Sequence, residues 1–181
     1  MNDLDKDIKD LEILISEEKI QQKLITLAEQ IEKSFPKDEE LYVICVLKGS
    51  IMFCADLVKH FNRPVQMEFI RISSYGNEQK SSNNLQAIDL TLPNLHKKNV
   101  LIVEDIIDTG LTARFLTDLF KIKHHPQKLL FVALLNKKCS RQIEIEPDLY
   151  GFEVDDKFVV GYGLDYKGYF RNLPYIGYFK N

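Results

Sequence analysis

The stretch V-L-I-V-E-D-I-I-D-T-G-L-T, residues 100–112, decides the fold class. It opens with an unbroken aliphatic run, which favours a strand buried on both faces, as in a parallel sheet covered by helices. Two adjacent carboxylates, Glu104 and Asp105, end this run. Successive side chains of a regular strand point to opposite faces. We therefore expect at least one of the two acids to lie in loop geometry.

A turn rich in hydroxyl groups follows the acid pair. Residues 108–112, D-T-G-L-T, come directly before a helical pattern. A helix start offers free backbone N–H groups and the positive end of the helix dipole, so this geometry accepts a phosphate. Carboxylates only accept hydrogen bonds and suit the hydroxyls of a sugar, or a metal ion. The stretch therefore predicts a site for a phosphorylated sugar.

Similar apolar runs alternate with helical patterns through the centre of the chain. Strands are predicted at 11–15, 41–47, 65–72, 87–92 and 129–135, with short strands near Tyr150 and Phe158. Helices are predicted from the Ser16 cap to before Pro36, after residue 50, and after residue 112. Residues 73–86 are polar and predict a loop. This pattern indicates an α/β fold, a twisted, mostly parallel sheet flanked by helices.

The ends of three predicted strands carry polar residues. These are residues 48–49, 104–112 and 136–138. Ligands of such sheets bind beyond the carboxyl ends of the strands. We therefore expect the three clusters to form one site.

Composition narrows the class of protein. A chain of 181 residues suits one domain. With 24 Lys and Arg against 27 Asp and Glu, the net charge of −3 argues against a nucleic-acid partner. The acidic start is unlike a signal peptide, and no apolar run approaches the roughly twenty residues of a membrane span. Three cysteines without metal-ligand spacing favour free thiols. We expect a cytoplasmic protein with neither nucleic-acid nor membrane partners.

Four separated motifs resemble the type I phosphoribosyltransferases, most closely their hypoxanthine-guanine branch. They are L-K-G-S (47–50), S-S-Y-G (73–76), V-E-D-I-I-D-T-G (103–110) and F-V-V-G-Y-G-L-D-Y (158–166). The resemblance extends from about Leu11 to Gly177. It implies the type I phosphoribosyltransferase fold in a single domain, 1–181. A small hood is expected from about 1–16 and 150–181, and a flexible lid loop from about 73–86.

The resemblance also implies a function. Enzymes of this branch transfer the phosphoribosyl group of phosphoribosyl pyrophosphate (PRPP) to a 6-oxopurine. We therefore expect purine salvage with hypoxanthine, and with guanine, giving IMP or GMP and pyrophosphate. The expected cofactor is magnesium (Mg2+), because it prefers phosphate oxygens. The small-molecule substrates are PRPP and the purine, and the protein is expected to be a homo-oligomer, a dimer or a tetramer.

Residue roles follow from the matching motif positions. Asp108 is the expected catalytic residue, which manages the proton of the purine imidazole ring. Thr109 and Thr112 are expected on the 5-phosphate. PRPP is expected to contact Glu104, Asp105, Ile106, Ile107, Asp108, Thr109, Gly110, Leu111 and Thr112. The pyrophosphate is expected on Lys48, Gly49 and Arg171, and the metal on Glu104, Asp105 and Asp165.

The purine and the lid complete the expected site. The purine is expected to contact Lys137, Phe158, Val159 and Asp165, and the lid to act through Ser74 and Tyr75. Lys137 has donors only, so it favours a 6-oxygen over the amino group of adenine. The chain departs from the family at residues 81–86, S-S-N-N-L-Q, where relatives place a small Ser/Thr-Gly element.

Other classes share parts of this pattern. V-L-I-V-E-D also opens phospho-acceptor receiver domains, but these need about 100 or more further residues, and only 69 follow Thr112. A nucleotide-sensing regulator that binds RNA would need a basic surface, which the composition disfavours. A phosphoribosyltransferase for another base, xanthine or a pyrimidine, remains the nearer alternative.

Overall fold

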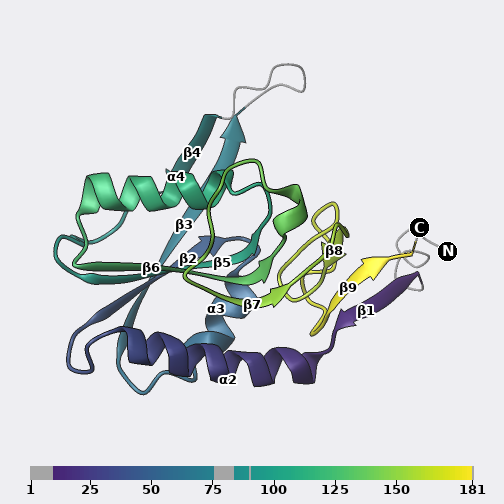
Figure 1. Ribbon diagram of the computed structural model, residues 1–181, viewed down its shortest axis with the longest axis horizontal. Helices are drawn as coiled ribbons and strands as arrows, with labels where there is room; N and C mark the ends of the chain where they lie inside the picture. The colour runs from purple at the N-terminus through teal and green to yellow at the C-terminus, as the bar shows by residue number, and fades with distance from the viewer. Residues whose placement is uncertain (1–9, 76–83, 90, 181) are drawn as a thin grey trace.

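The computed structural model of the protein describes residues 10–75, 84–89 and 91–180, which form a large sheet and a small sheet (Figure 1). In spatial order the large sheet contains β4 (Asn84–Asp89), β3 (Val65–Tyr75), β2 (Leu41–Leu47), β5 (Asn99–Ile107), β6 (Lys128–Asn136) and β7 (Leu149–Glu153). Neighbours from β3 to β7 are parallel, and β4 alone of these described strands is antiparallel. The predicted mostly parallel sheet is confirmed.

Helices cover both faces of the large sheet. α2 (Glu17–Ser34) and α3 (Ile51–Val58) lie on one face, and α4 (Leu111–Leu119) with its π-helical extension η1 (Phe120–His124) lies on the other (Figure 1). The aliphatic run of β5 serves both layers. Leu101 and Val103 belong to the core beneath α2 and α3, whereas Val100 and Ile102 belong to the core beneath α4. This alternation is why the strand reads as continuously apolar.

The start and end of α2 agree with the sequence pattern. The Ser16 side chain accepts a hydrogen bond from the backbone N–H of Lys19 at 3.4 Å, and Glu17 and Glu18 occupy the first turn. Carboxylates there interact favourably with the helix dipole. The helix ends two residues before Pro36. Among the described residues, no helix has both the length and the apolar run that a membrane span requires.

The two terminal segments pair in the small sheet. Its described strands, β1 (Leu11–Ile15), β9 (Ile176–Phe179) and β8 (Val159–Val160), are antiparallel and lie at one end of the molecule (Figure 1). The expected hood boundary at residue 150 is too early, because β7 pairs in parallel with β6 and belongs to the large sheet.

The loop predicted at 73–86 has its bounds too wide at both ends. β3 continues through Tyr75, and β4 begins at Asn84 opposite it, so residues 73–75 and 84–86 are strand. Backbone pairing satisfies polar residues as well as apolar ones, which is why polarity alone mispredicted both ends. Residues 76–83 of the expected lid, including part of the 81–86 departure, lie outside the described residues. Ser74 and Tyr75 lie in β3, and the expected lid role of their side chains stays a prediction.

Candidate active site

The acid pair lies in β5 and not in a loop. β5 continues through Ile107, because β6 still pairs with it at Glu104 and Ile106 after the pairing with β2 stops at Val103. The expectation of loop geometry for Glu104 or Asp105 is therefore wrong. Both acids lie within the strand, at the edge where the parallel strands end.

Glu104 and Asp105 repel each other in a poorly solvated place. Burial raises the pKa of Glu104, and the neighbouring Asp105 charge raises it further. Burial also raises the pKa of Asp105, partly offset by hydrogen bonds, including one from Glu104, and by the charge of Arg171. Glu104 Oε2 is buried and has no hydrogen-bond partner among the described residues. A cation or sugar hydroxyls at this position would relieve that cost.

Glycines bring two other segments onto the acid pair. Gly49 follows β2, and a Cβ there would lie 1.6 Å from Asp105 Oδ2. Gly163, at φ +101°, is packed in the same way, because its Cβ would lie 2.0 Å from the carbonyl oxygen of Gly49. Only glycine allows such close approach. The L-K-G-S motif, the acid pair and the C-terminal motif therefore meet at one point.

Arg171 faces the acid pair from the C-terminal segment. Its Nη1 donates to the carbonyl oxygen of Gly163 at 2.6 Å, and its Nη2 lies 2.5 Å from Asp165 Oδ1. The other carboxylate oxygen of Asp165 accepts from the N–H of Gly168 at 2.7 Å. Among the described residues no group of three His, Cys, Asp or Glu side chains is arranged for a metal ion. Asp165 pairs with Arg171 here, and the expected metal set of Glu104, Asp105 and Asp165 stays a prediction.

Asp108 and Lys137 lie at neighbouring strand ends. The backbone N–H of Lys137 donates to the carbonyl oxygen of Ile107 at 2.9 Å, beside Asp108. The hydrogen bond with Asp156, and to a smaller degree the charge of Asp108, raise the pKa of Lys137. Asp108 Oδ1 is buried and without a partner among the residues that the structure describes. The expected base and the expected purine contact thus lie close together at the same edge of the sheet.

Asp156 is a residue that the sequence analysis missed. Its Oδ1 lies 2.8 Å from Lys137 Nζ, and its side chain is 79% exposed. The ion pair brings Lys137 to the segment just before Phe158. No motif marks Asp156, and its neighbour Asp155 is equally acidic, so only the contact distinguishes them.

Phe158 has the properties of a stacking surface. It is 60% exposed, although large aromatic side chains are usually buried. Its ring is held edge-on by Tyr166, with centroids 5.8 Å apart, and Tyr166 packs in turn on Phe179. Val159 is buried and pairs with Tyr178 in the small sheet. A planar ligand can therefore stack on a ring whose position is fixed from behind.

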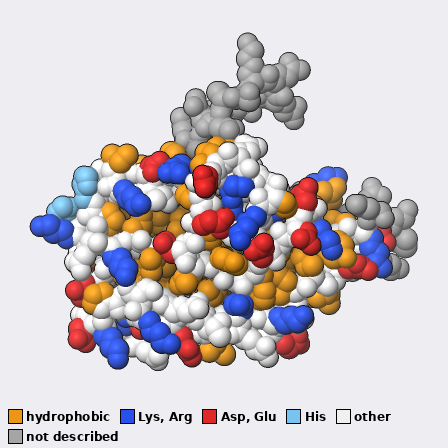
Figure 2. All heavy atoms as spheres, viewed as in Figure 1, with side chains coloured by type: hydrophobic (Ala, Val, Ile, Leu, Met, Phe, Trp, Pro, Cys, Tyr) orange, Lys and Arg blue, Asp and Glu red, His pale blue; other side chains and the backbone are white. Residues whose placement is uncertain are grey.

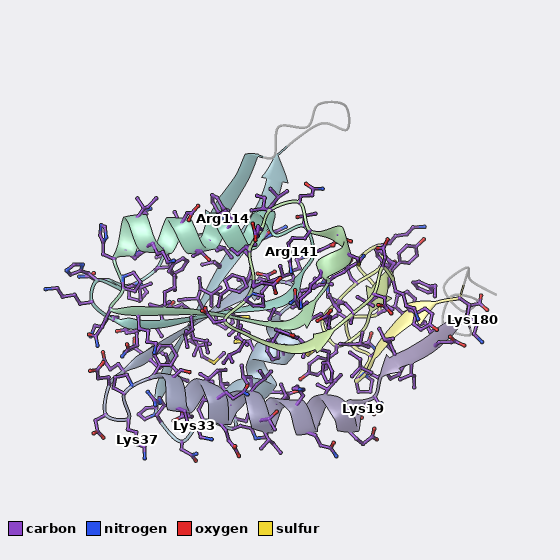
Figure 3. The ribbon with its side chains drawn as sticks, in the orientation of Figure 1. Lys19, Lys33, Lys37, Arg114, Arg141 and Lys180 are labelled. Atoms are coloured by element: carbon purple, nitrogen blue, oxygen red, sulfur yellow. The ribbon has the colours of Figure 1, made fainter. Side chains whose placement is uncertain are left out.

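The predicted phosphate turn begins α4. Gly110 adopts φ +86°, and Leu111 N–H donates to Thr109 Oγ1 at 3.4 Å. Arg141, a second residue that the motifs do not mark, donates from Nη1 to the carbonyl oxygen of Asp108 at 3.1 Å. Figure 3 shows Arg141 near the start of α4, where Arg114 also lies. The turn is thus supported from the segment after β6.

An acid pair, a phosphate turn and an exposed aromatic ring lie on segments that follow the strands of a parallel α/β sheet. Comparison with known proteins identifies the class. Residues 11–167 match the family described as Phosphoribosyl transferase domain. The chain belongs to the phosphoribosyltransferase family, and the expectation from its motifs is confirmed.

Individual relatives within the family include hypoxanthine-guanine phosphoribosyltransferases. A hypoxanthine-guanine phosphoribosyltransferase of Bacillus subtilis (strain 168) is 44% identical over 168 residues, 93% of this chain and 92% of that protein. The crystal structure of a hypoxanthine-guanine phosphoribosyltransferase from Bacillus anthracis matches with a TM-score of 0.87 at 44% identity, covering 93% of this chain and 98% of that one. A hypoxanthine phosphoribosyltransferase structure from Staphylococcus aureus has a TM-score of 0.89 at 38% identity, covering 99% and 96%. These matches confirm the type I fold.

Proposed function

We propose that the protein is a purine salvage enzyme that transfers the phosphoribosyl group of PRPP to hypoxanthine and guanine, giving IMP or GMP and pyrophosphate. The observation that carries this proposal is the convergence of separately encoded segments, in which Gly49 packs on Asp105 and Gly163 packs on Gly49. The phosphate turn follows the same strand as Asp105, and Lys137 follows the neighbouring strand β6. The 44% identity to a hypoxanthine-guanine enzyme supports the choice of base.

Asp108 supplies the proton acceptor in this proposal. As one purine ring nitrogen bonds to the anomeric carbon of PRPP, the bond from that carbon to the pyrophosphate oxygen breaks. The proton on the opposite imidazole nitrogen then becomes acidic and passes to the Asp108 carboxylate. A weak base is sufficient at that stage if it is correctly placed. The buried, unpartnered Oδ1 of Asp108 supports this role.

Lys137 and Phe158 select the base. The pairing of Lys137 with Asp156 raises the pKa of the ammonium group, which therefore stays charged and donates hydrogen bonds at neutral pH. An ammonium donor matches the 6-oxygen of hypoxanthine or guanine. The amino group of adenine would leave it unpaired, at a cost of about 1–3 kcal/mol. The exposed ring of Phe158 provides the stacking face.

We assign a magnesium ion to Glu104 and Asp105. Magnesium binds few carboxylates, keeps several waters and prefers phosphate oxygens, so two acids and a pyrophosphate are sufficient ligands. The unpartnered Glu104 Oε2 and the repulsion within the acid pair fit a cation. When bound, the ion would stabilise the charge that grows on the departing pyrophosphate. The protein would stabilise the same charge through Arg171, which faces Asp105, and through the Lys48–Gly49 loop.

A competition assay tests the proposal. The protein is incubated with PRPP, magnesium and an equimolar mixture of hypoxanthine, guanine, xanthine, adenine and uracil, and the nucleotides formed are identified by mass spectrometry. We expect IMP and GMP, and neither when a chelator replaces magnesium. XMP or UMP as the main product would instead assign another base. No nucleotide, together with a salt-dependent shift of RNA, would favour the regulator class.

A homo-oligomer, dimer or tetramer, is part of the proposal. Its support is the exposure of apolar side chains beyond the cleft: Ile51 (42%), Met52 (39%) and Phe69 (47%). Light scattering coupled to gel filtration measures the mass, and a monomer at micromolar concentration would contradict this part.

Charged side chains of both signs are interspersed on the face shown in Figure 2, which is unlike a nucleic-acid-binding surface.

A further inference from the structure

Arg141 connects the end of β6 to the beginning of the phosphate turn. It follows the 3-10 turn η2 (Lys138–Ser140), and its Nη1 donates to the carbonyl oxygen of Asp108 at 3.1 Å. Its Nη2 donates to Oδ1 of Asn136, the last residue of β6. Asn136 is fully buried, and its Nδ2 donates to Glu146 Oε2 at 2.9 Å. One guanidinium therefore bridges two strand ends that both contribute to the cleft.

The backbone after Arg141 holds the next peptide of the turn. The N–H groups of Gln142 and Ile143 donate to the carbonyl oxygen of Thr109 at 2.9 and 3.2 Å. A Cβ on Gly110 would lie 2.8 Å from Ile145 Cγ2, so the turn is packed tightly against the same segment. The carbonyls of Asp108 and Thr109 are thus both bonded by residues 141–143.

These bonds determine where two amide hydrogens point. In a planar trans peptide the C=O and the N–H point in opposite directions. The bond from Arg141 to the Asp108 carbonyl therefore directs the Thr109 N–H away from Arg141. The bonds to the Thr109 carbonyl do the same for the Gly110 N–H. Both amides are therefore directed away from residues 141–143, and the D-T-G-L-T motif predicts the 5-phosphate as their partner.

We infer that Arg141 is a positioning residue for this site. Its guanidinium holds the Asp108–Thr109 peptide so that the Thr109 amide faces the phosphate and the Asp108 carboxylate faces the base. The planar fork is required, because its two donors reach Asp108 and Asn136 at once, and the ammonium group of a lysine is a single point. This inference rests on the proposed function and adds to it a residue outside the four motifs.

The test compares R141K and R141Q with a matched control, R114Q. Arg114 lies nearby (Figure 3), but it is exposed and donates to the carbonyl oxygen of Glu144 at 3.1 Å. The measurements are the dissociation constant of PRPP by calorimetry, kcat and KM for both substrates, and the melting temperature. Losing two charge-assisted bonds should lower kcat/KM for PRPP by about 30-fold in R141Q and by about 10-fold or more in R141K. R114Q should stay within about twofold of the wild type.

The split between substrates separates positioning from general damage. We expect the PRPP dissociation constant to rise in both Arg141 variants, with the KM for hypoxanthine and the melting temperature of R141K nearly unchanged. An R141K protein with wild-type kinetics would overturn the role of the fork. An equal loss in R114Q would reduce the effect to charge alone and overturn the inference. If the wild-type protein itself binds no PRPP, the proposed function is wrong. Calorimetry on the wild type therefore separates that failure from a failure of the Arg141 inference.

Discussion

Two pairs of ionisable residues occupy opposite ends of the same sheet. One pair has its hydrogen bonds satisfied within the protein, and the other does not. Arg63, just before β3, is at the amino end, where its side chain is 3% exposed. Its Nε lies 3.1 Å from Glu32 Oε1, and its Nη1 donates to the carbonyl oxygen of Pro36 at 2.8 Å. Glu104 and Asp105, at the carboxyl end, are adjacent acids whose pKa values burial raises, and Glu104 Oε2 has no partner among the described residues.

The difference separates a structural site from a functional one. The Arg63 guanidinium has its charge paired with Glu32 and donates to backbone carbonyl oxygens, so its polar groups are satisfied within the protein. The acid pair is left with repulsion and an unpaired oxygen, which cost stability until something binds. Lys33 and Lys37, labelled at the lower left in Figure 3, mark the end of α2 near Glu32, well away from Arg141. Mutations at the two ends should therefore affect different properties, stability at one and turnover at the other.

Asp108→Asn should give the largest effect at the carboxyl end. Asparagine keeps the shape of the side chain but cannot accept the purine proton. We expect kcat to fall about 10³-fold, in the range of lost general base catalysis, with PRPP binding within about threefold. Steady-state kinetics and calorimetry measure the two quantities, and circular dichroism checks the fold. An unchanged kcat would refute the catalytic role.

The sequence predicted the structure correctly where the pattern was local or repeated along the chain. The β5 run V-L-I-V alternates between two cores, so its apolar character directly reported a buried parallel strand. Ser16 capped α2 as its residue type predicts. Three of the four motifs, L-K-G-S, V-E-D-I-I-D-T-G and F-V-V-G-Y-G-L-D-Y, meet at one edge of the sheet. Gly163 contacts the carbonyl oxygen of Gly49 because Gly163 lacks a Cβ, and Gly49 lies against Asp105 for the same reason.

What the sequence missed depends on contacts between distant segments. Arg141 and Asp156 carry no pattern of their own, and their partners Asp108 and Lys137 are reached only after the strands align. The position of Glu104 within β5 was mispredicted because continued pairing with β6, not side-chain chemistry, determines where the strand ends. The ion pair between Asp165 and Arg171 could not be read from spacing either.

Glu32→Gln tests the amino end. Removing the carboxylate leaves the Arg63 charge nearly buried and unpaired, so the free energy of unfolding should fall by about 3 kcal/mol. kcat/KM should stay within twofold, because Arg63 is remote from the cleft. Urea denaturation measures the change, and Glu29→Gln is the matched control. Glu29 pairs with Lys33 on the same helix at 3.9 Å with both side chains exposed, and its loss should cost about 0.5 kcal/mol or less. Comparable losses in the two variants would contradict the distinction between buried and exposed pairs.

Glu104→Gln should raise the free energy of unfolding, whereas Glu32→Gln lowers it, and the change should be smaller. The pKa of Glu104 is raised in the folded protein, so the folded state holds a proton that the unfolded state releases above about pH 4.3. Stability is therefore fully present below that pH and falls as the pH rises through the folded pKa. Glutamine removes the contribution of Glu104 to this dependence. We expect E104Q to unfold at higher urea than the wild type at pH 8, by about 1 kcal/mol, while losing activity.

The pH series decides that prediction. Urea midpoints at pH 5, 6, 7 and 8 should diverge between wild type and E104Q as the pH rises, and saturating PRPP with magnesium should raise the wild-type midpoint. Parallel curves would mean that the acid pair costs the fold nothing. The comparison between the two ends of the sheet would then fail at the carboxyl end.

Asp156→Asn should give the smallest effect. The pair with Lys137 is exposed on the Asp156 side, so solvent and salt screen it. Losing it should loosen the Lys137 ammonium and raise the KM for hypoxanthine by about threefold, with kcat for saturating purine unchanged. Asp155→Asn removes an equal charge one residue away and should leave the KM unaltered. Since the interaction is electrostatic, the wild-type KM should approach that of D156N as salt rises toward 1 M. A salt-independent gap, or an equal effect in D155N, would mean that Asp156 does not hold Lys137 through its charge.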